Sequence, residues 1–188
     1  MNVKEPTIIT IQKVDKTNFH PDSLDDFSRA QTVTNVYRLR NGQLCLVHHP
    51  FTEDWSPERK REKAAEILSG NFITFCAFAH ERVLGCIMLK PELNEGRMIV
   101  HSFHVSTDQR RRGLGSKLFE AAKAEARDRH AVALYISACS AEETIRFYLA
   151  MGCRLSPNPI PAMVEDEPWD IQLEYPLEEA EQERELFQ

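Results

Sequence analysis

Apolar and polar residues alternate in several short runs of the chain and recur at helical spacing in others. Alternation is typical of a strand with one buried face, whereas spacings of three and four residues are typical of an amphipathic helix. The pattern predicts strands at 7–14, 72–79, 83–89, 98–105, 132–137 and 169–175, a hairpin at 35–48, and helices at 22–31, 56–68, 114–129 and 141–151. A loop is expected at 91–96. The order of these elements predicts a mixed α/β (α+β) domain with helices on both faces of a central sheet.

Turn and cap residues locate several ends of these elements. Asn41-Gly42 is a strong hairpin signal, since both residue types tolerate the positive φ angles of a tight turn. Ser56 is suited to cap a helix N-terminus, Pro57 suits the first helical position, and Gly70 suits the position after the end. We therefore expect the hairpin to turn at 41–42 and the helix to lie between Ser56 and Gly70.

Composition narrows the class of protein. A chain of 188 residues suits one domain with a full core, and no apolar run approaches the roughly 20 residues of a membrane-spanning helix. The net charge of -6 disfavours nucleic acid as a partner and is compatible with a cationic amine substrate. The five cysteines contain no CxxC pair, and His48 and His49 would face opposite sides of a strand, so no metal site is expected. We expect a cytoplasmic protein with no membrane partner, with one domain at 1–177 and an acidic tail at 178–188.

The strongest chemical signal is a glycine-containing turn between the strand that ends near Val105 and the helix at 114–129. Its glycines permit a tight turn, and the first N–H groups of the helix have no partner within it. These N–H groups, the helix dipole and neighbouring arginines suit a diphosphate. A Walker A loop or a dinucleotide-binding fingerprint would need a different spacing. The candidate phosphate-binding residues are Arg110, Arg111, Arg112, Gly113, Leu114, Gly115 and Ser116.

The spacing Arg110-x-x-Gly113-x-Gly115 resembles the R/Q-x-x-G-x-G/A signature of the GNAT acetyltransferase superfamily, in which this turn binds the pyrophosphate of acetyl-CoA. The segment 146–153 is similar to the FYxxxGF segment of that family, with Cys153 in place of the usual aromatic residue. The resemblance covers 72–155. It implies a single N-acetyltransferase domain with a splayed strand pair as the cofactor cleft, acetyl-CoA as cofactor, and acetyl transfer to an amine (an acyltransferase of the EC 2.3.1 class, with an amino-acyl acceptor).

The resemblance also implies which residues bind the cofactor outside the turn. The strand segment Phe103, His104 and Val105 corresponds to the strand whose free backbone groups pair with the pantetheine arm. Family members often have a cofactor-binding asparagine where this chain has Ala141, so we expect the adjacent Ser140 to take its place.

Two side chains are candidates for proton transfer. Tyr148 matches the family tyrosine that protonates the leaving thiolate, and a phenol with a pKa of about 10 is protonated at neutral pH. His101 lies where family members place a base, and histidine titrates in the useful range. The alternatives are a core packing role for Tyr148, a structural role for His101, and a water-relayed carboxylate such as Glu92 or Glu95 as base.

Asp54 and Trp55 precede the helix at 56–68, in the region that usually shapes the acceptor pocket of the superfamily. They suit a cationic, partly apolar amine, and a packing role for Trp55 is the alternative. The acceptor is expected to be a primary amine of a small molecule. A peptide or protein amine remains open, as do a non-catalytic acyl-CoA sensor and a homodimer.

Overall fold

The structure is a computed structural model that describes residues 8–177. The predicted acidic tail at 178–188 lies outside these residues. The chain forms two compact units. The first contains residues 8–29, Asp54–Leu89 and Ser102–Ala122, and the second contains Ala30–Glu53, Lys90–His101 and residues 123–177. Within residues 8–177, no helix has the length and apolar character needed to cross a membrane.

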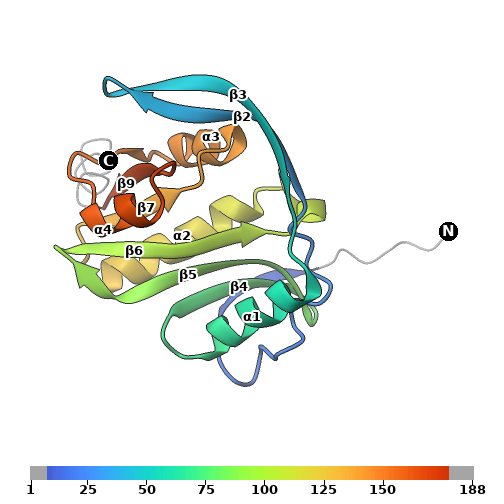
Figure 1. The fold of residues 1–188 in the computed structure, drawn as a ribbon. Helices are drawn as coiled ribbons and strands as arrows, with labels where there is room; N and C mark the ends of the chain where they lie inside the picture. The colour runs from blue at the N-terminus through green and yellow to red at the C-terminus, as the bar shows by residue number, and fades with distance from the viewer. Residues whose placement is uncertain (1–7, 178–188) are drawn as a thin grey trace. The chain divides into compact units, whose positions relative to one another are not determined.

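The first unit contains an antiparallel arrangement of strands with a helix packed on one face (Figure 1). Strand β1 (Ile9–Lys13) pairs with β4 (Ile73–Ala79), which pairs with β5 (Arg82–Asn94). Helix α1 (Pro57–Leu68) buries Ala64 and Ile67 in a core that also contains Phe27 and Phe78. The core therefore lies between α1, the segment before the hairpin, and one face of β4 and β5.

The second unit combines a long hairpin with a mixed set of strands. In Figure 1 the hairpin of β2 (Gln31–Arg40) and β3 (Gln43–Glu53) arches over α3 (Glu142–Ala150). Val36 of β2 forms a bridge with Ala141, and both are buried with Val33. The remaining elements are β7 (Ala133–Ala138), β8 (Arg154–Leu155), α4 (Pro161–Asp166) and β9 (Ile171–Pro176).

The strands outside the hairpin hydrogen-bond in the order β1-β4-β5-β6-β7-β9-β8. Strand β6 (Arg97–Val105) is parallel to β7, whereas the neighbours of β9 are antiparallel to it. The parallel register covers only Arg97–Val100 and Ala133–Ile136, although both strands continue beyond it. The structure thus has a mixed sheet with helices, in which β6 and β7 pair over only four residues. This confirms the predicted fold class.

Local signals in the sequence are confirmed at several ends of elements. Asn41 and Gly42 have φ angles of 49° and 77° and join β2 to β3. The Ser56 side chain accepts a hydrogen bond from the Arg59 N–H at the start of α1, and Gly70 has a φ angle of 77° just after its end.

Two predicted elements differ from the structure. The expected helix at 22–31 is a series of turns, with hydrogen bonds from the Asp25 N–H to the Asp22 carbonyl and from the Phe27 N–H to the Leu24 carbonyl. Such bonds span three residues rather than four, so they keep apolar side chains at a helix-like spacing without forming an α-helix. The expected loop at 91–96 is wrong for most of its length, because β5 continues to Asn94.

Candidate active site

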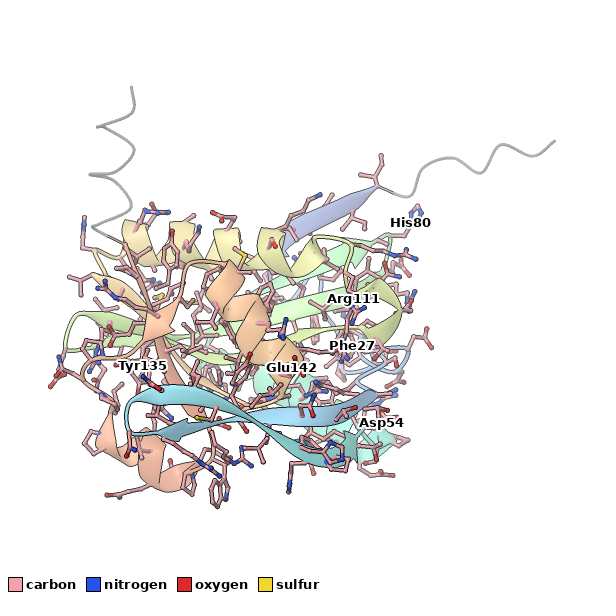
Figure 2. All side chains as sticks on the ribbon, turned by 90° about the horizontal axis from the view of Figure 1, so that it is seen from above. Phe27, Asp54, His80, Arg111, Tyr135 and Glu142 are labelled. Atoms are coloured by element: carbon pink, nitrogen blue, oxygen red, sulfur yellow. The ribbon has the colours of Figure 1, made fainter. Side chains whose placement is uncertain are left out.

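The arginine-rich turn lies between a short 3-10 helix, η1 (Thr107–Gln109), and helix α2 (Leu114–Asp128). Arg111, labelled in Figure 2, has a φ angle of 61° and Gly113 one of 76°. These two left-handed residues reverse the chain within the turn. The Arg110 Nε donates to the Val105 carbonyl at 3.3 Å, while Arg111 and Arg112 are exposed. The turn therefore joins the end of β6 to the start of α2.

The residue before η1 anchors this turn. Ser106 is fully buried, and its hydroxyl donates to the Asp108 carboxylate at 2.7 Å. Arg82 forms an ion pair with the same carboxylate at 2.8 Å. The Ser106 hydrogen bond above all, with those from Gln109 and Arg82, lowers the pKa of Asp108, so this carboxylate stays ionised. The start of the turn is therefore fixed to β5 and β6.

The turn has the features that a diphosphate requires. The hydrogen bond from the Lys117 N–H to the Gly113 carbonyl spans 3.2 Å, so the N–H groups of residues 114–116 precede the bonded part of the helix. A Cβ atom at Gly113 would meet no atom within 4 Å, which shows open space above the backbone. The first turn of α2 contains no acidic residue that would repel an anion. The residues present therefore fit the pyrophosphate of coenzyme A.

Strand β6 brings two of the predicted site residues together. The His104 ring meets the Trp55 ring edge-on at a centroid distance of 4.7 Å, and Trp55 stacks on Phe27 at 5.8 Å. The Arg29 Nε donates to the His104 Nδ1 at 3.2 Å. Next to Trp55, the Asp54 carboxylate accepts a hydrogen bond from the Trp55 backbone N–H at 2.7 Å.

These surroundings keep the His104 imidazole neutral. Burial lowers the pKa of His104 to about 3, and the positive charges of Arg29, Lys63, Arg110 and Arg59 lower it further in that order. A neutral ring whose Nδ1 accepts from Arg29 carries its proton on Nε2. His104 is therefore a hydrogen-bond donor through Nε2 at neutral pH. Sequence reasoning missed Arg29, because it lies 75 positions before its partner.

Phe103 contributes to packing rather than to this cluster. Its ring stacks on Phe119 of α2 at 6.5 Å. The Phe103 side chain therefore packs β6 against α2. Any contact of Phe103 with the cofactor would be made by its backbone.

The second unit contains the other predicted residues: His101, Ser140 and Tyr148. The Ser140 hydroxyl accepts a hydrogen bond from the Arg38 Nη1 at 2.7 Å, and its carbonyl accepts one from the Tyr37 N–H. Ser140 thus ties α3 to the hairpin. His101 is half-buried on β6.

Tyr148 lies in α3 with only 5% of its surface exposed. Burial raises the pKa of Tyr148, and the negative charges that Cys153, Asp170 and Cys139 can carry raise it further. The phenol therefore stays protonated throughout the neutral range.

Asp170 was not predicted as a site residue. The Ser137 hydroxyl donates to the Asp170 Oδ2 at 3.3 Å, just before β9 begins. Burial raises the pKa of Asp170 to about 6, the charges of Glu167 and Glu53 also raise it, and the Ser137 hydrogen bond opposes them. In the sequence this residue is one polar position of an alternating strand, so nothing set it apart.

The family of the chain follows from comparison with known proteins. Residues 41–153 match the model of the acetyltransferase (GNAT) family, and the chain belongs to this family. The predicted resemblance is confirmed, and with it acetyl-CoA as the cofactor. No curated protein sequence matches the chain.

Solved structures share the fold at low sequence identity. Nourseothricin acetyltransferase is 18% identical with a TM-score of 0.68, covering 90% of this chain and 98% of its own. An aminoglycoside 6'-N-acetyltransferase complexed with coenzyme A is 16% identical with a TM-score of 0.57, covering 89% and 97%. The ribosomal-protein-S18-alanine N-acetyltransferase of Escherichia coli is 15% identical with a TM-score of 0.57, covering 90% and 94%. At these identities the likeness establishes the fold alone.

Proposed function

We propose that this protein is an acetyl-CoA-dependent N-acetyltransferase that acetylates a primary amine of a small molecule. The observation that supports it best is the turn at 110–116, where Gly113 has open space above it and helix N–H groups lie beside exposed arginines. Acetyl-CoA supplies an activated acetyl thioester when bound. The five free thiols favour the reducing environment of the cytoplasm.

The turn and the strand before it hold the cofactor in this proposal. The N–H groups of residues 114–116 donate to the pyrophosphate, and Arg111 and Arg112 add positive charge in exposed positions. In the same proposal, backbone groups of Phe103, His104 and Val105 bind the pantetheine arm.

Tyr148 acts as the hydrogen-bond donor to the leaving sulfur. Its raised pKa keeps the phenol protonated, which an acid requires. Full transfer to a thiolate, whose conjugate acid has a pKa of about 8.5, is uphill from a phenol whose own pKa lies above 10. Tyr148 therefore stabilises the developing negative charge by a hydrogen bond rather than by early proton transfer.

The acceptor class rests on the side chains at Trp55 and on the fold neighbours. The Trp55 ring is half-buried beside His104 and offers an apolar surface next to the exposed Asp54. Among the structural neighbours, nourseothricin acetyltransferase and the aminoglycoside enzyme are named for small-molecule acceptors. The S18-alanine enzyme is named for a protein acceptor, so a peptide amine is the second candidate. Turnover with nourseothricin, kanamycin, lysine and a short peptide with a free N-terminus distinguishes the two.

The turn is tested by calorimetry of acetyl-CoA binding with two matched glycine variants. Gly113 and Gly70 have φ angles of 76° and 77°, and a Cβ atom would meet nothing within 4 Å at either position. Tryptophan therefore introduces the same backbone strain at both, of the order of 1–2 kcal/mol. Only at Gly113 does the new ring fill the space above the phosphate-binding turn.

We expect wild type and Gly70→Trp to bind acetyl-CoA with similar micromolar affinity and Gly113→Trp to lose at least tenfold. Equal affinity in both variants would move the cofactor away from this turn. An absence of binding to the wild type at millimolar acetyl-CoA would reject the proposed function itself.

A further inference from the structure

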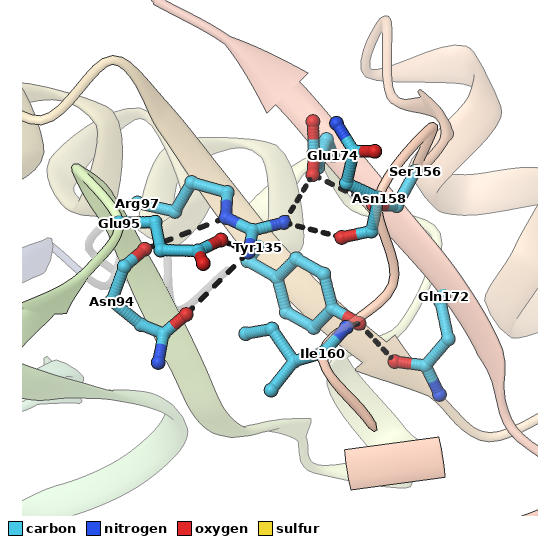
Figure 3. A network of polar contacts seen from close by, with 9 residues as sticks. All are labelled: Asn94, Glu95, Arg97, Tyr135, Ser156, Asn158, Ile160, Gln172 and Glu174. Carbon is cyan, nitrogen blue, oxygen red and sulfur yellow. Dashed lines mark hydrogen bonds and ion pairs between the residues drawn. The ribbon is translucent and has the colours of Figure 1, made fainter. Parts of the chain in front are cut away.

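Asp170 lies at the end of a hydrogen-bonded chain of side chains in the second unit. The Tyr135 hydroxyl donates to the Gln172 Oε1 at 2.7 Å (Figure 3). The Gln172 amide donates to the Ser137 hydroxyl at 2.8 Å, and Ser137 donates to Asp170 at 3.3 Å. The chain starts in the buried core, where Tyr135 has no exposed surface, and ends at the half-buried Asp170.

The direction of every bond in this chain is fixed. The Ile160 backbone N–H donates to the Tyr135 oxygen at 2.9 Å, so the Tyr135 hydrogen is directed to Gln172 (Figure 3). The Gln172 oxygen is then an acceptor and its amide nitrogen a donor to Ser137, whose own hydrogen is left for Asp170. The carboxylate at the end receives a donor on Oδ2. Within residues 8–177, no hydrogen bond reaches its Oδ1, which leaves that oxygen for a further donor.

Within residues 8–177, the charged groups that shift the pKa of Asp170 are both negative. Glu167 at the end of α4 and Glu53 at the end of β3 are both acidic and act on Asp170. Tyr148 of α3 is protonated. On β2, the Arg38 guanidinium lies over the Trp169 ring at 4.9 Å and donates to Ser140. A half-buried carboxylate in these surroundings is stabilised by a bound cation.

We infer that Asp170 binds the ammonium group of the acceptor and removes its proton, acting as the catalytic base. This inference rests on the proposed function. It replaces His101, which the sequence favoured as the base, by the carboxylate of Asp170, which lies between α4 and β9. The substrate class that such a residue selects is a cationic primary amine.

The chemistry balances with one proton released. An N–H bond of the ammonium breaks, the proton moves to the Asp170 Oδ1, and the bonding pair remains on nitrogen. That lone pair forms a C–N bond with the acetyl carbon while the C–S bond breaks. The nitrogen loses a second proton when it is acylated, and the sulfur takes up one proton, so these two changes cancel. The proton held by Asp170 is the one released overall, and it leaves to solvent.

The surroundings of Asp170 suit this task. A pKa raised to about 6 makes Asp170 a stronger base than an ordinary carboxylate while leaving it ionised at neutral pH. The same negative charge raises the pKa of Tyr148. Ionised Asp170 and protonated Tyr148 are therefore mutually favoured states, as a base and a donor require.

The first test needs no turnover. The side-chain carboxyl of Asp170, assigned in a carbon-13 NMR titration by its loss in Asp170→Asn, is expected to titrate near pH 6. Addition of 1,4-diaminobutane at millimolar concentration should lower that midpoint, because a bound cation favours the ionised form. A midpoint near pH 4, or one that the diamine does not move, overturns the inference.

The second test is thermal stability. A raised pKa means that the folded protein is more stable when Asp170 is protonated than when it is ionised. Ionised Asp170 therefore destabilises the folded protein above pH 6, and this effect decreases as the pH falls below 6. Asp170→Asn is therefore expected to raise Tm by several degrees at pH 7.5 and by less at pH 4.5. A merely structural Asp170 would give the opposite result, a lower Tm at pH 7.5.

The kinetic test compares the pH dependence of kcat/KM for the best amine of the panel above. The kcat/KM of the wild type should fall below about pH 6. The kcat/KM of Asp170→Asn should be about 100-fold lower than that of the wild type at pH 7 and should recover as the pH approaches the pKa of the amine. Ser137→Ala should move the acid limb to higher pH. Glu165→Gln, the same type of change at an exposed carboxylate of α4, should match wild type within twofold.

The inference and the proposed function fail in different ways. If Asp170→Asn binds acetyl-CoA and turns over with a wild-type pH profile while His101→Gln abolishes the acid limb, then His101 is the base and the inference is wrong. If the wild type does not bind acetyl-CoA, the proposed function is wrong, and the NMR titration still decides whether Asp170 is an ammonium site.

Discussion

His104 shows how one side chain on β6 links the chemistry of the site to the stability of the fold. Its Nδ1 accepts from Arg29 and its ring packs against Trp55, which are both contacts of a neutral imidazole. Protonation would place a second positive charge beside Arg29. Acid should therefore weaken the packing around His104 in the first unit.

We predict that His104→Asn makes the protein less sensitive to acid. The pKa of His104 is lowered from 6.5 to about 3, so its neutral form favours the fold fully above pH 6.5. That contribution falls as the pH drops from 6.5 towards 3, and about 2 kcal/mol of it is lost by pH 5. Asparagine keeps an acceptor for Arg29 but does not take up the proton.

Urea unfolding at pH 7.5 and pH 5.0 provides the measurement. The loss of unfolding free energy between the two pH values should be about 2 kcal/mol smaller in His104→Asn than in wild type. His80→Asn changes an exposed histidine of the same unit and should keep the wild-type pH dependence. Equal losses in all three proteins would show that His104 is not held neutral.

Single residues were predictable where the local sequence determines their conformation. Gly113 was identified because glycine-rich turns before a helix have a distinctive spacing, and its positive φ confirms the conformation. Arg29 and Asp170 could not be found in this way, since their partners lie 75 and 33 positions away in the chain. Their roles arise from tertiary packing alone.

At the scale of elements, the turn before α2 places a non-glycine residue in a conformation that favours glycine. Arg111 has a φ angle of 61°, which costs an L-residue of the order of 1–2 kcal/mol. The side chain of Arg111 is exposed in this turn. The turn therefore carries a positive charge at the start of the helix together with backbone strain that lowers the stability of the fold.

We predict that Arg111→Gly stabilises the protein and weakens cofactor binding. Relief of strain, partly offset by the greater freedom of glycine in the unfolded chain, should raise the unfolding free energy by roughly 0.5 kcal/mol. Loss of a charge near the pyrophosphate should raise the Kd for acetyl-CoA about three- to tenfold. Thermal melts and calorimetry on the same samples measure the two effects.

The neighbouring Arg112 provides the control for this pair of effects. It is exposed in the same turn but has no positive φ. Arg112→Gly should therefore weaken acetyl-CoA binding without raising Tm. If both glycine variants stabilise the protein equally, the strain at Arg111 is not the cause.

Elements were predictable where caps and turn residues agreed with the apolar pattern. Ser56 and Gly70 bracket α1, and Asn41-Gly42 sets the hairpin. The helix predicted at 22–31 was wrong because consecutive three-residue turns bury Leu24 and Phe27 at the same spacing as a helix. Pro91 suggested a loop, although a proline is tolerated where a strand residue does not need to donate a hydrogen bond.

At the scale of the whole molecule, the positive charge of the turn proposed to bind the cofactor is opposite in sign to the net charge of the chain. The chain carries a net charge of -6 at pH 7, which repels the anionic coenzyme. Two unit charges about 5 Å apart interact by about 0.8 kcal/mol in water, and at about 20 Å by only about 0.2 kcal/mol before screening. With a Debye length of about 8 Å at physiological salt, the distant charges lose nearly all of that. The arginines of the turn therefore dominate.

We accordingly predict that salt weakens acetyl-CoA binding despite the negative net charge. Raising NaCl from 50 to 500 mM should increase the Kd several-fold, because screening removes the short-range attraction to Arg111 and Arg112 and little else. Calorimetry at both salt concentrations gives the ratio, and in Arg112→Gly that ratio should be smaller. A Kd that decreases with salt would mean that the net charge controls the encounter with the coenzyme, and the anion would then have to bind away from the arginine-rich turn.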